Sequence, residues 1–184
     1  MSETKSNMTE LGSTAPDFKL LNTIDGSYTS LDECKSDIAT VIMFICNHCP
    51  YVLHVNPELV KVANEYSAKG ISFVGISAND VENYPQDAPE LMTTHAQEVG
   101  YEFPYLYDET QDIAKAYGAA CTPDFFVYDK DLKLVYRGRF DGSTPGNGVE
   151  VTGEELKAAL DALVENKPVS TEQNYSLGCN IKWK

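Results

Sequence analysis

The apolar positions of the chain fall into short continuous runs and longer stretches with helical spacing. Two runs, at 38–45 and 71–77, are rich in β-branched and large apolar residues, which is typical of strands buried on both faces of a sheet. Between these runs, from Cys49 to Lys69, apolar residues recur every three or four positions, which predicts an amphipathic helix that ends at Gly70. Pro57 lies inside this stretch and predicts a kink or a break there.

Strand and helix patterns also occur before and after the segment 38–77. The turn-forming pair Asp25-Gly26 lies between two short apolar segments and predicts an N-terminal β-hairpin. Helical spacing recurs further along the chain at 89–100, 108–118 and 152–166, and strand patterns recur at 124–129 and 133–140. Strands that alternate with helices form crossover units, so the sequence predicts an α/β fold with a central mixed sheet covered by helices on both faces.

The length of the chain indicates one folded domain. At 184 residues, 42% of them hydrophobic, it can bury one substantial core, and neither a repeat nor a long linker divides it. The polar start is expected to be mobile. We therefore predict a flexible N-terminus at 1–12, a domain at 13–166 and a C-terminal tail at 167–184 that carries Cys179.

Charge narrows the range of partners. The formal net charge of -14 argues against nucleic acid and against an anionic membrane surface, because both are themselves negative. No apolar run approaches the roughly 20 residues that are needed to cross a bilayer. The first residues also lack the apolar core of a secretory signal. We therefore expect a cytoplasmic protein that binds neither a membrane nor nucleic acid.

Cysteines are the residues that point to chemistry, and the chain has five: Cys34, Cys46, Cys49, Cys121 and Cys179. Cytosolic thiol pools keep cysteines reduced, and an odd number argues against a purely structural disulfide framework. Cys46 and Cys49 form a C-x-x-C pair, whose side chains can meet around one helical turn. In the cytosol such a pair is more often catalytic or metal-binding than structural.

The predicted position of this pair favours a redox role. Cys46 follows the strand at 38–45 and Cys49 begins the next helix, at the edge where open α/β sheets place their ligand sites. The free N–H groups and the dipole of a helix N-terminus favour a thiolate over a thiol. A Cys46 thiolate can attack a substrate disulfide, and Cys49 can then displace the product by forming the internal bond. A protonated His48 would stabilise the thiolate; the alternative is that His48 is an exposed residue with no catalytic role.

Three segments together carry a resemblance to a known family. The segment "APDFKLLNTIDGSYTSL", a buried strand that ends in C-x-x-C-P, and "CTPDFFVYD" resemble the thioredoxin-like superfamily, in particular its peroxiredoxin-like branch of alkyl hydroperoxide reductase and thiol-specific antioxidant proteins. The resemblance covers most of the chain and implies a thioredoxin-like fold. It also implies an oxidoreductase that needs no cofactor, with a protein disulfide or a peroxide as substrate and a thiol donor such as a thioredoxin system.

The resemblance also assigns a role to the Thr122-Pro123 peptide. This peptide is similar to the family's cis-proline beside the active site, which implies that the backbone of Thr122 pairs with an extended substrate. The alternative for Pro123 is an ordinary trans proline that opens a strand.

Other positions depart from the peroxiredoxin pattern. Peroxiredoxins place a proline seven residues and a threonine three residues before the peroxide-attacking cysteine. Counting back from Cys49 gives Ile42 and Cys46 instead, and counting back from Cys46 gives Ala39 and Met43. Cys49-Pro50 still resembles the peroxidatic "C-P" pair, so a peroxidase that uses Cys49 is the alternative function. Its arginine would be one of the two in the chain, Arg137 and Arg139.

Other residues leave alternatives open. Cys121 directly precedes Thr122 and is either a resolving thiol, a third metal ligand or a small buried residue. Cys179 either folds back to the site or has no role there, and Cys34 is expected to be a bystander. The sequence assigns surface or packing roles to His54 and His95. The acidic segment at 79–87 is expected to be a solvated loop, with an active-site rim as the alternative.

Two further classes compete with the enzyme. Cys46, Cys49 and Cys121, with Cys179 or His48, are a ligand set for zinc or copper(I), although the later cysteines lack C-x-x-C spacing. A binding module without redox activity is the other class. The sequence favours neither of these two classes. We predict a thiol-disulfide oxidoreductase in which Cys46 and Cys49 cycle between dithiol and disulfide. An antioxidant role is one outcome of this activity.

Overall fold

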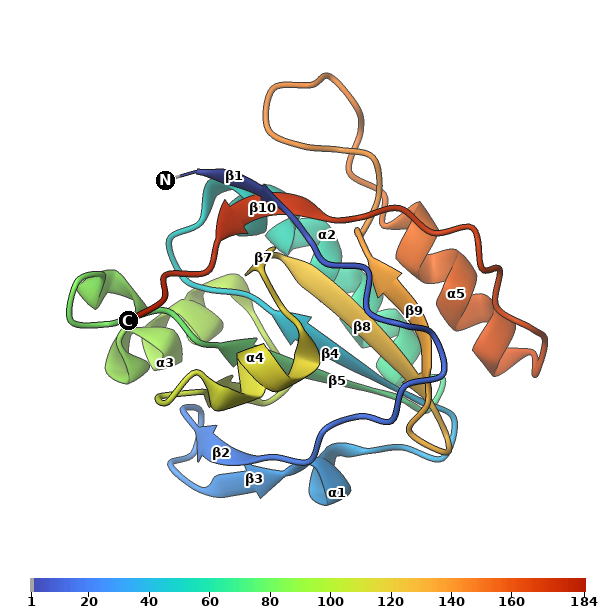
Figure 1. The fold of residues 1–184 in the computed structure, drawn as a ribbon, viewed down its shortest axis with the longest axis horizontal. Helices are drawn as coiled ribbons and strands as arrows, with labels where there is room; N and C mark the ends of the chain where they lie inside the picture. Colours follow the sequence, from blue (N-terminus) through green and yellow to red (C-terminus); the bar gives the residue numbers. More distant parts are fainter. Residues whose placement is uncertain (1) are drawn as a thin grey trace.

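The computed structural model describes residues 2–184, which form two β-sheets with helices around the larger one (Figure 1). The larger sheet has seven strands in the order β3-β2-β6-β5-β4-β8-β9. Its strands are β2 (Lys19–Asn22), β3 (Tyr28–Ser30), β4 (Ala39–Phe44), β5 (Ile71–Ser77), β6 (Tyr105–Tyr107), β8 (Asp124–Asp129) and β9 (Leu134–Gly138). Strands β4, β5 and β6 are parallel and β8 is antiparallel to β4, so the predicted mixed sheet is confirmed.

Strand β4 lies at the centre of this sheet, and all six of its residues are buried. Its side chains alternate between the two faces, because successive residues of a strand point in opposite directions. Val41 and Met43 belong to the core on one face, and Ile42 and Phe44 belong to the core on the other. The continuous apolar run that predicted a strand buried on both faces is thus explained by two separate cores.

Helices cover both faces of the sheet. Three helices contribute to the core that contains Val41, and these are α2 (Pro50–Ser67), α3 (Pro89–Val99) and α5 (Glu154–Val164). Two shorter helices contribute to the opposite core, α1 (Leu31–Cys34) and α4 (Asp112–Tyr117). Helix α2 continues through Pro57 without the break that we considered. Among the described residues, no helix is long and apolar enough to cross a membrane.

The predicted N-terminal hairpin is confirmed as an extension of the main sheet. Strands β2 and β3 pair antiparallel, and β2 continues the sheet through Leu21, which is opposite Tyr107 of β6. At the turn, Asp25 Oδ1 accepts hydrogen bonds from the backbone N–H and the hydroxyl of Ser27. The residue between them, Gly26, has a positive φ of 78°, which suits glycine.

The smaller sheet joins the two ends of the chain to the middle of the sequence. It has the order β1-β10-β7, with β1 (Glu3–Lys5), β10 (Leu177–Asn180) and β7 (Cys121–Thr122), and both pairings are antiparallel. Figure 1 shows β10 between β1 and β7. Strand β1 lies within the segment 1–12 that we expected to be flexible, of which residue 1 lies outside the described residues. Strand β10 lies within the C-terminal tail predicted at 167–184 and carries Cys179. These short strands are held by main-chain hydrogen bonds, which do not depend on which side chains are present. The sequence therefore shows no apolar pattern that would predict them.

Candidate active site

The two cysteines of the C-x-x-C pair lie where the sequence placed them. Cys46 lies two residues beyond the end of β4, at the carboxyl end of the central strands. Cys49 is the N-cap residue of α2, and its carbonyl oxygen accepts hydrogen bonds from the backbone N–H groups of Val52 and Leu53. Pro50 occupies the first position of the helix, where a missing N–H removes no intrahelical hydrogen bond.

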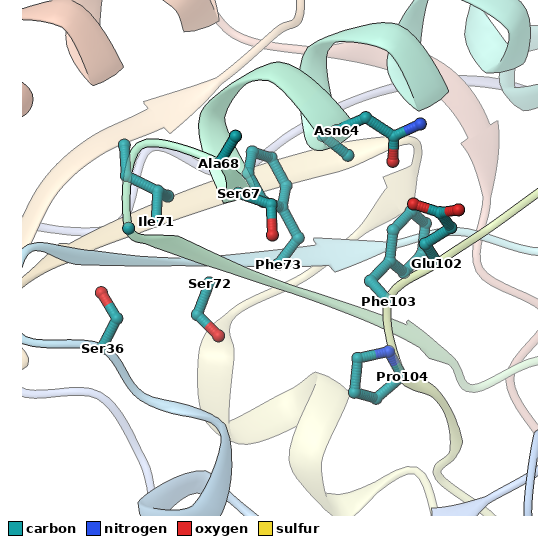
Figure 2. Close-up of a pocket in the computed structure, with 12 residues that line it drawn as sticks. Ser36, Asn64, Ser67, Ala68, Ile71, Ser72, Phe73, Glu102, Phe103 and Pro104 are labelled. Atoms are coloured by element: carbon teal, nitrogen blue, oxygen red, sulfur yellow. The ribbon is translucent and has the colours of Figure 1, made fainter.

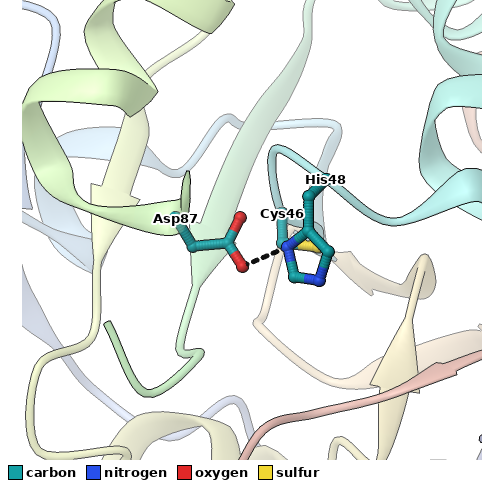
Figure 3. A group of neighbouring side chains, drawn as sticks. All are labelled: Cys46, His48 and Asp87. Atoms are coloured by element: carbon teal, nitrogen blue, oxygen red, sulfur yellow. Dashed lines mark ion pairs between the residues drawn. The ribbon is translucent and has the colours of Figure 1, made fainter. Parts of the chain in front are cut away.

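A buried ion pair lies beside Cys46. The Nδ1 atom of His48 is 2.6 Å from the Oδ2 atom of Asp87, whose side chain is fully buried. Asp87 belongs to the 3-10 helix η1 (Pro85–Asp87), and its carboxylate also accepts hydrogen bonds from the backbone N–H of Asn47 and the side-chain amide of Asn79. Figure 3 shows the side chains of Cys46, His48 and Asp87 gathered at this point.

The surroundings of His48 favour its charged form. The hydrogen bond with Asp87 is the largest cause that raises the pKa of His48 from 6.5 to about 9, and the hydrogen bond with Cys46 is the second. Burial acts in the opposite direction. Burial alone would raise the pKa of Asp87, but its hydrogen bonds with His48 and Asn79 hold that pKa below its usual value. The pair is therefore an imidazolium and a carboxylate at neutral pH. A positive imidazolium beside a cysteine favours the thiolate, the form that acts as a nucleophile.

Tyr84 completes the environment of this ion pair. Its ring stacks on the imidazole of His48, with the centroids 5.8 Å apart and the planes at 9°. The ammonium group of Lys182 lies 5.6 Å from the centroid of the Tyr84 ring. The acidic segment at 79–87 therefore forms one wall of the site, which is the alternative that we gave for it.

Thr122 brings the reactive sulfurs together. Its hydroxyl oxygen is 3.7 Å from the Cys46 sulfur, and its carbonyl oxygen is 3.4 Å from the Cys49 sulfur. The Thr122-Pro123 peptide is cis, as the resemblance implied. In the small sheet, Thr122 of β7 is the register partner of Cys179 of β10. Three cysteines thus surround one threonine.

The disulfide in the structure joins Cys49 to Cys179, whereas we expected Cys46 and Cys49 to form the redox pair. The two bonded residues are 130 positions apart in the sequence, and their Cα atoms are 6.2 Å apart. Cys46 remains a free, buried thiol. Of our two alternatives for Cys179, the structure shows the one in which it folds back to the site. Local sequence could not indicate this, because the pairing of β10 with β7 brings Cys179 there.

Cys121 and Cys34 lie apart from this arrangement. The Cys121 sulfur is 3.9 Å from the carbonyl oxygens of Pro123 and Ser176, and burial raises the pKa of its thiol well above the usual value. Cys34 lies in α1 in the opposite core, where burial raises its pKa to about 11. The environments of both residues favour protonated thiols.

The other candidate side chains have partners elsewhere. His54 Nε2 is 2.7 Å from the hydroxyl oxygen of Ser143, and the ring of His95 meets that of Tyr101 edge to face. Among the arginines, Arg137 donates hydrogen bonds to the Thr9 carbonyl and to the Gln173 side chain. Arg139 forms an ion pair with Glu155.

The metal-binding alternative takes a different form in the structure. Neither predicted ligand set is available in this state, because both include Cys49, which is bonded to Cys179. The donor atoms of Cys46, His48 and Asp87 lie within 4.8 Å of one another, and sulfur, imidazole and carboxylate are all ligands that zinc accepts. The carboxylate of Asp87 is already engaged by His48, Asn47 and Asn79, so this cluster is complete as a hydrogen-bonded ion pair.

A hollow of about 480 Å³ lies elsewhere in the protein (Figure 2). It is lined by the end of α2, the start of β5 and the residues before β6, among them Asn64, Ser72 and Glu102. It therefore lies at the opposite end of the parallel strands from Cys46. No cysteine or histidine is among its lining residues, so we assign no redox chemistry to it.

Comparison with known proteins agrees with the fold. Residues 11–137 match the model of the AhpC/TSA family. The chain belongs to the AhpC/TSA family. This membership confirms the prediction of a thioredoxin-like, peroxiredoxin-like oxidoreductase with a thioredoxin-like fold.

Individual relatives extend the comparison. An uncharacterized conserved protein from Geobacillus kaustophilus is 61% identical, with a TM-score of 0.99 over 100% of this chain and 97% of that chain. A hypothetical protein from Sinorhizobium meliloti 1021 is 46% identical, with a TM-score of 0.96 over 98% of each chain. The thiol-disulfide oxidoreductase ResA of Bacillus thuringiensis subsp. konkukian (strain 97-27) is 22% identical over 88% of this chain and 81% of the relative.

Proposed function

We propose that this protein is a thiol-disulfide oxidoreductase in which Cys46 is the attacking thiol. The observation that carries the proposal is the buried His48–Asp87 ion pair beside the Cys46 sulfur. The imidazolium of His48, partly buried and held by the fully buried Asp87, is a fixed positive charge, and such a charge favours the thiolate of the cysteine next to it. The similarity to the ResA relative, which is named a thiol-disulfide oxidoreductase, supports the same chemistry.

The reaction follows from the positions of the two sulfurs. The Cys46 thiolate attacks one sulfur of a substrate disulfide, so that a Cys46–substrate bond forms and the substrate's own disulfide breaks. The Cys49 thiolate then attacks the Cys46 sulfur and releases the second substrate thiolate. Both departing thiolates take up protons from solvent. The substrate gains two electrons, and the pair Cys46 and Cys49 loses them.

We further propose a protein disulfide as the substrate and a dithiol protein, such as a thioredoxin, as the electron donor. A cytoplasmic location fits this donor, because the cytosol maintains reduced thiol proteins. An antioxidant role would follow from the repair of oxidised protein thiols.

A peroxidase reaction at Cys49 is the second candidate, and the Cys49–Cys179 disulfide is the observation that favours it. If peroxide oxidised Cys49 to a sulfenic acid, condensation with the Cys179 thiol would release water and give this disulfide. Membership of the AhpC/TSA family is consistent with that reaction. Against it, both arginines are held by other residues, and Cys49 is fully buried.

The experiment that separates the two candidates uses fully reduced protein. Wild type, Cys46→Ser and Cys49→Ser are mixed in turn with a dye-quenched peptide disulfide and with hydrogen peroxide, and Cys34→Ser is the matched control. We expect Cys46→Ser to abolish disulfide exchange, and Cys49→Ser to stop at a Cys46–peptide mixed disulfide. Exchange by Cys46→Ser at the wild-type rate would overturn the proposal. Rapid peroxide consumption that survives Cys46→Ser but not Cys49→Ser would establish the peroxidase instead.

A further inference from the structure

The C-terminal strand β10 closes the site over its cysteines. Cys46, Cys49 and Cys179 are 1%, 0% and 2% exposed. Strand β10 pairs with β7 through Cys179, opposite Thr122, and through Asn180, opposite Cys121. The edge of Thr122 that an extended substrate would pair with is therefore occupied by a segment of the same chain.

Contacts on both sides of Cys179 hold β10 in this place. Before it, the backbone N–H of Ser176 donates to the Ser6 hydroxyl at 2.7 Å. After it, the backbone N–H of Lys182 donates to the Asn79 side chain at 2.8 Å, and the side-chain amide of Gln111 donates to the Lys182 carbonyl at 2.9 Å. The segment is thus seated by specific contacts in addition to the disulfide.

Gly178 allows the closest approach between β10 and β7. A Cβ atom built at this position would lie 2.0 Å from the carbonyl oxygen of Thr122, a distance at which the backbone must shift. A residue with a side chain cannot occupy this position while β10 stays paired. The absence of a side chain at Gly178 therefore makes the closed arrangement of Cys179 and Cys49 sterically possible.

We propose that Cys179 is a third redox residue. It exchanges with the Cys46–Cys49 disulfide to form a Cys49–Cys179 disulfide, and this bond closes the site in the oxidised protein. The Cys179 thiol gives its proton to solvent, and its thiolate attacks the Cys49 sulfur. The Cys49–Cys179 bond forms as the Cys46–Cys49 bond breaks, and Cys46 departs as a thiolate beside His48. One disulfide replaces another, so no further oxidant is needed. This inference rests on the proposed function, since it begins from the disulfide that substrate reduction leaves.

The environment of the leaving sulfur favours this exchange. Thiol-disulfide exchange is faster when the departing thiolate is stabilised. Cys46 departs next to the ion pair of His48 and Asp87, whose donor atoms lie within 4.8 Å of its sulfur. The oxidised protein then holds a regenerated Cys46 thiolate beneath β10, and reduction of Cys49–Cys179 by the donor releases the strand for the next substrate.

Disulfide mapping over time tests the order of these steps. Reduced wild-type protein is mixed with the peptide disulfide, quenched with acid, alkylated and digested for mass spectrometry. We expect the Cys46–Cys49 linkage to appear first and to decline as Cys49–Cys179 accumulates and Cys46 becomes alkylated. In Cys179→Ser we expect the Cys46–Cys49 linkage to persist, with no alkylated Cys46. Cys34→Ser is the control and is expected to follow the wild-type course.

A second variant tests the closed strand without removing a sulfur. Gly178→Ala is expected to shift the oxidised protein from the Cys49–Cys179 linkage towards Cys46–Cys49. The matched control is Gly142→Ala, because the atoms nearest to a Cβ atom there belong to the Arg139 guanidinium, at 3.6 Å or more, which is ordinary contact. A circular dichroism spectrum and a thermal melt confirm that each variant is folded. Equal linkage populations in the two folded alanine variants would overturn the role of β10.

The outcomes separate this inference from the proposed function. Wild-type protein that reduces the peptide through Cys46 but ends with the Cys46–Cys49 bond would overturn the relay and leave the proposed function standing. Cys49–Cys179 that forms in Cys46→Ser as fast as in wild type would overturn both, because Cys46 would then take no part in oxidation. Free, alkylated Cys46 in oxidised Cys179→Ser would also overturn the relay.

Discussion

The Nδ1 atom of His48 lies 2.6 Å from the Oδ2 atom of Asp87, and this contact joins the C-x-x-C loop to a segment that follows β5. It fixes a positive charge close to the Cys46 sulfur, inside a site with little access to water. The expected reactivity of Cys46 and the expected dependence of stability on pH both follow from this contact.

Replacement of Asp87 by asparagine is expected to lower the pKa of His48, because the carboxylate is the main cause of its elevation. At pH 7 the imidazole would then lose much of its charge, and the Cys46 thiolate its stabilisation. We expect reduced Asp87→Asn to be alkylated by iodoacetamide about tenfold more slowly at Cys46 than wild type, which corresponds to roughly 1.4 kcal/mol. Asp131→Asn, in the exposed turn before β9, is the control. Equal rates for the two variants would contradict the assigned role of Asp87.

The same ion pair is expected to make stability depend on pH. The folded pKa of His48, about 9, exceeds its ordinary value of 6.5, so the contribution of the pair to the free energy of unfolding is complete below about pH 6.5 and is lost as pH rises through about 9. A rise in pKa of this size corresponds to about 3.4 kcal/mol, and solvent screening at the partly buried imidazole reduces the expected contribution to about 2 kcal/mol. Urea denaturation of wild type and His48→Gln, both oxidised, should show a difference at pH 6.5 that shrinks towards pH 10. A difference that is constant with pH would contradict this prediction.

The disulfide is expected to add stability through chain entropy. It closes a loop between residues 130 positions apart, and in the chain-entropy model a crosslink over a loop of this length stabilises the folded protein by about 5 kcal/mol. Reduction of the wild type should therefore lower the denaturant midpoint. Cys179→Ser should have a low midpoint under oxidising and reducing conditions alike, whereas the midpoint of Cys34→Ser should still respond to reduction. An unchanged wild-type midpoint would mean that the bond adds no stability.

Cys121 and Cys34 are expected to be unreactive while the protein is folded. Burial raises the pKa of each thiol, to about 11 for Cys34, so very little thiolate exists at pH 8. Iodoacetamide at that pH should modify neither residue in native oxidised protein, and should modify both in guanidinium chloride. Modification of Cys121 in the native state at the rate of an exposed thiol would restore it as a candidate resolving cysteine.

The parts of the fold that the sequence predicted are those whose apolar periodicity is local. The buried runs that became β4 and β5, and the amphipathic stretch that became α2, follow directly from that periodicity. Strands β1, β7 and β10 are only three, two and four residues long, and backbone pairing between distant segments holds them. Pairing of this kind leaves no pattern in the side chains, so the small sheet was missed.

The candidate site divides in the same way. Cys46 and Cys49 were found because their spacing is local, and Thr122-Pro123 because its sequence resembles a known motif. Asp87 was missed as an individual residue, since an acidic residue in a polar segment has the same local signature whether it is solvated or buried. Its partner His48 lies 39 positions away from it in the sequence. Only the folded chain shows that the two side chains meet.

The small sheet also has a practical consequence for anyone who produces the protein. Strand β1 begins at Glu3, which is the register partner of Cys179, and β10 ends at Asn180, one residue after Cys179. Figure 1 shows these two strands side by side. An affinity tag or a fluorescent fusion at either end would therefore begin within a few residues of the reactive centre. A tag inserted in the exposed turn at Lys130-Asp131, between β8 and β9, would leave both ends of the chain as they are.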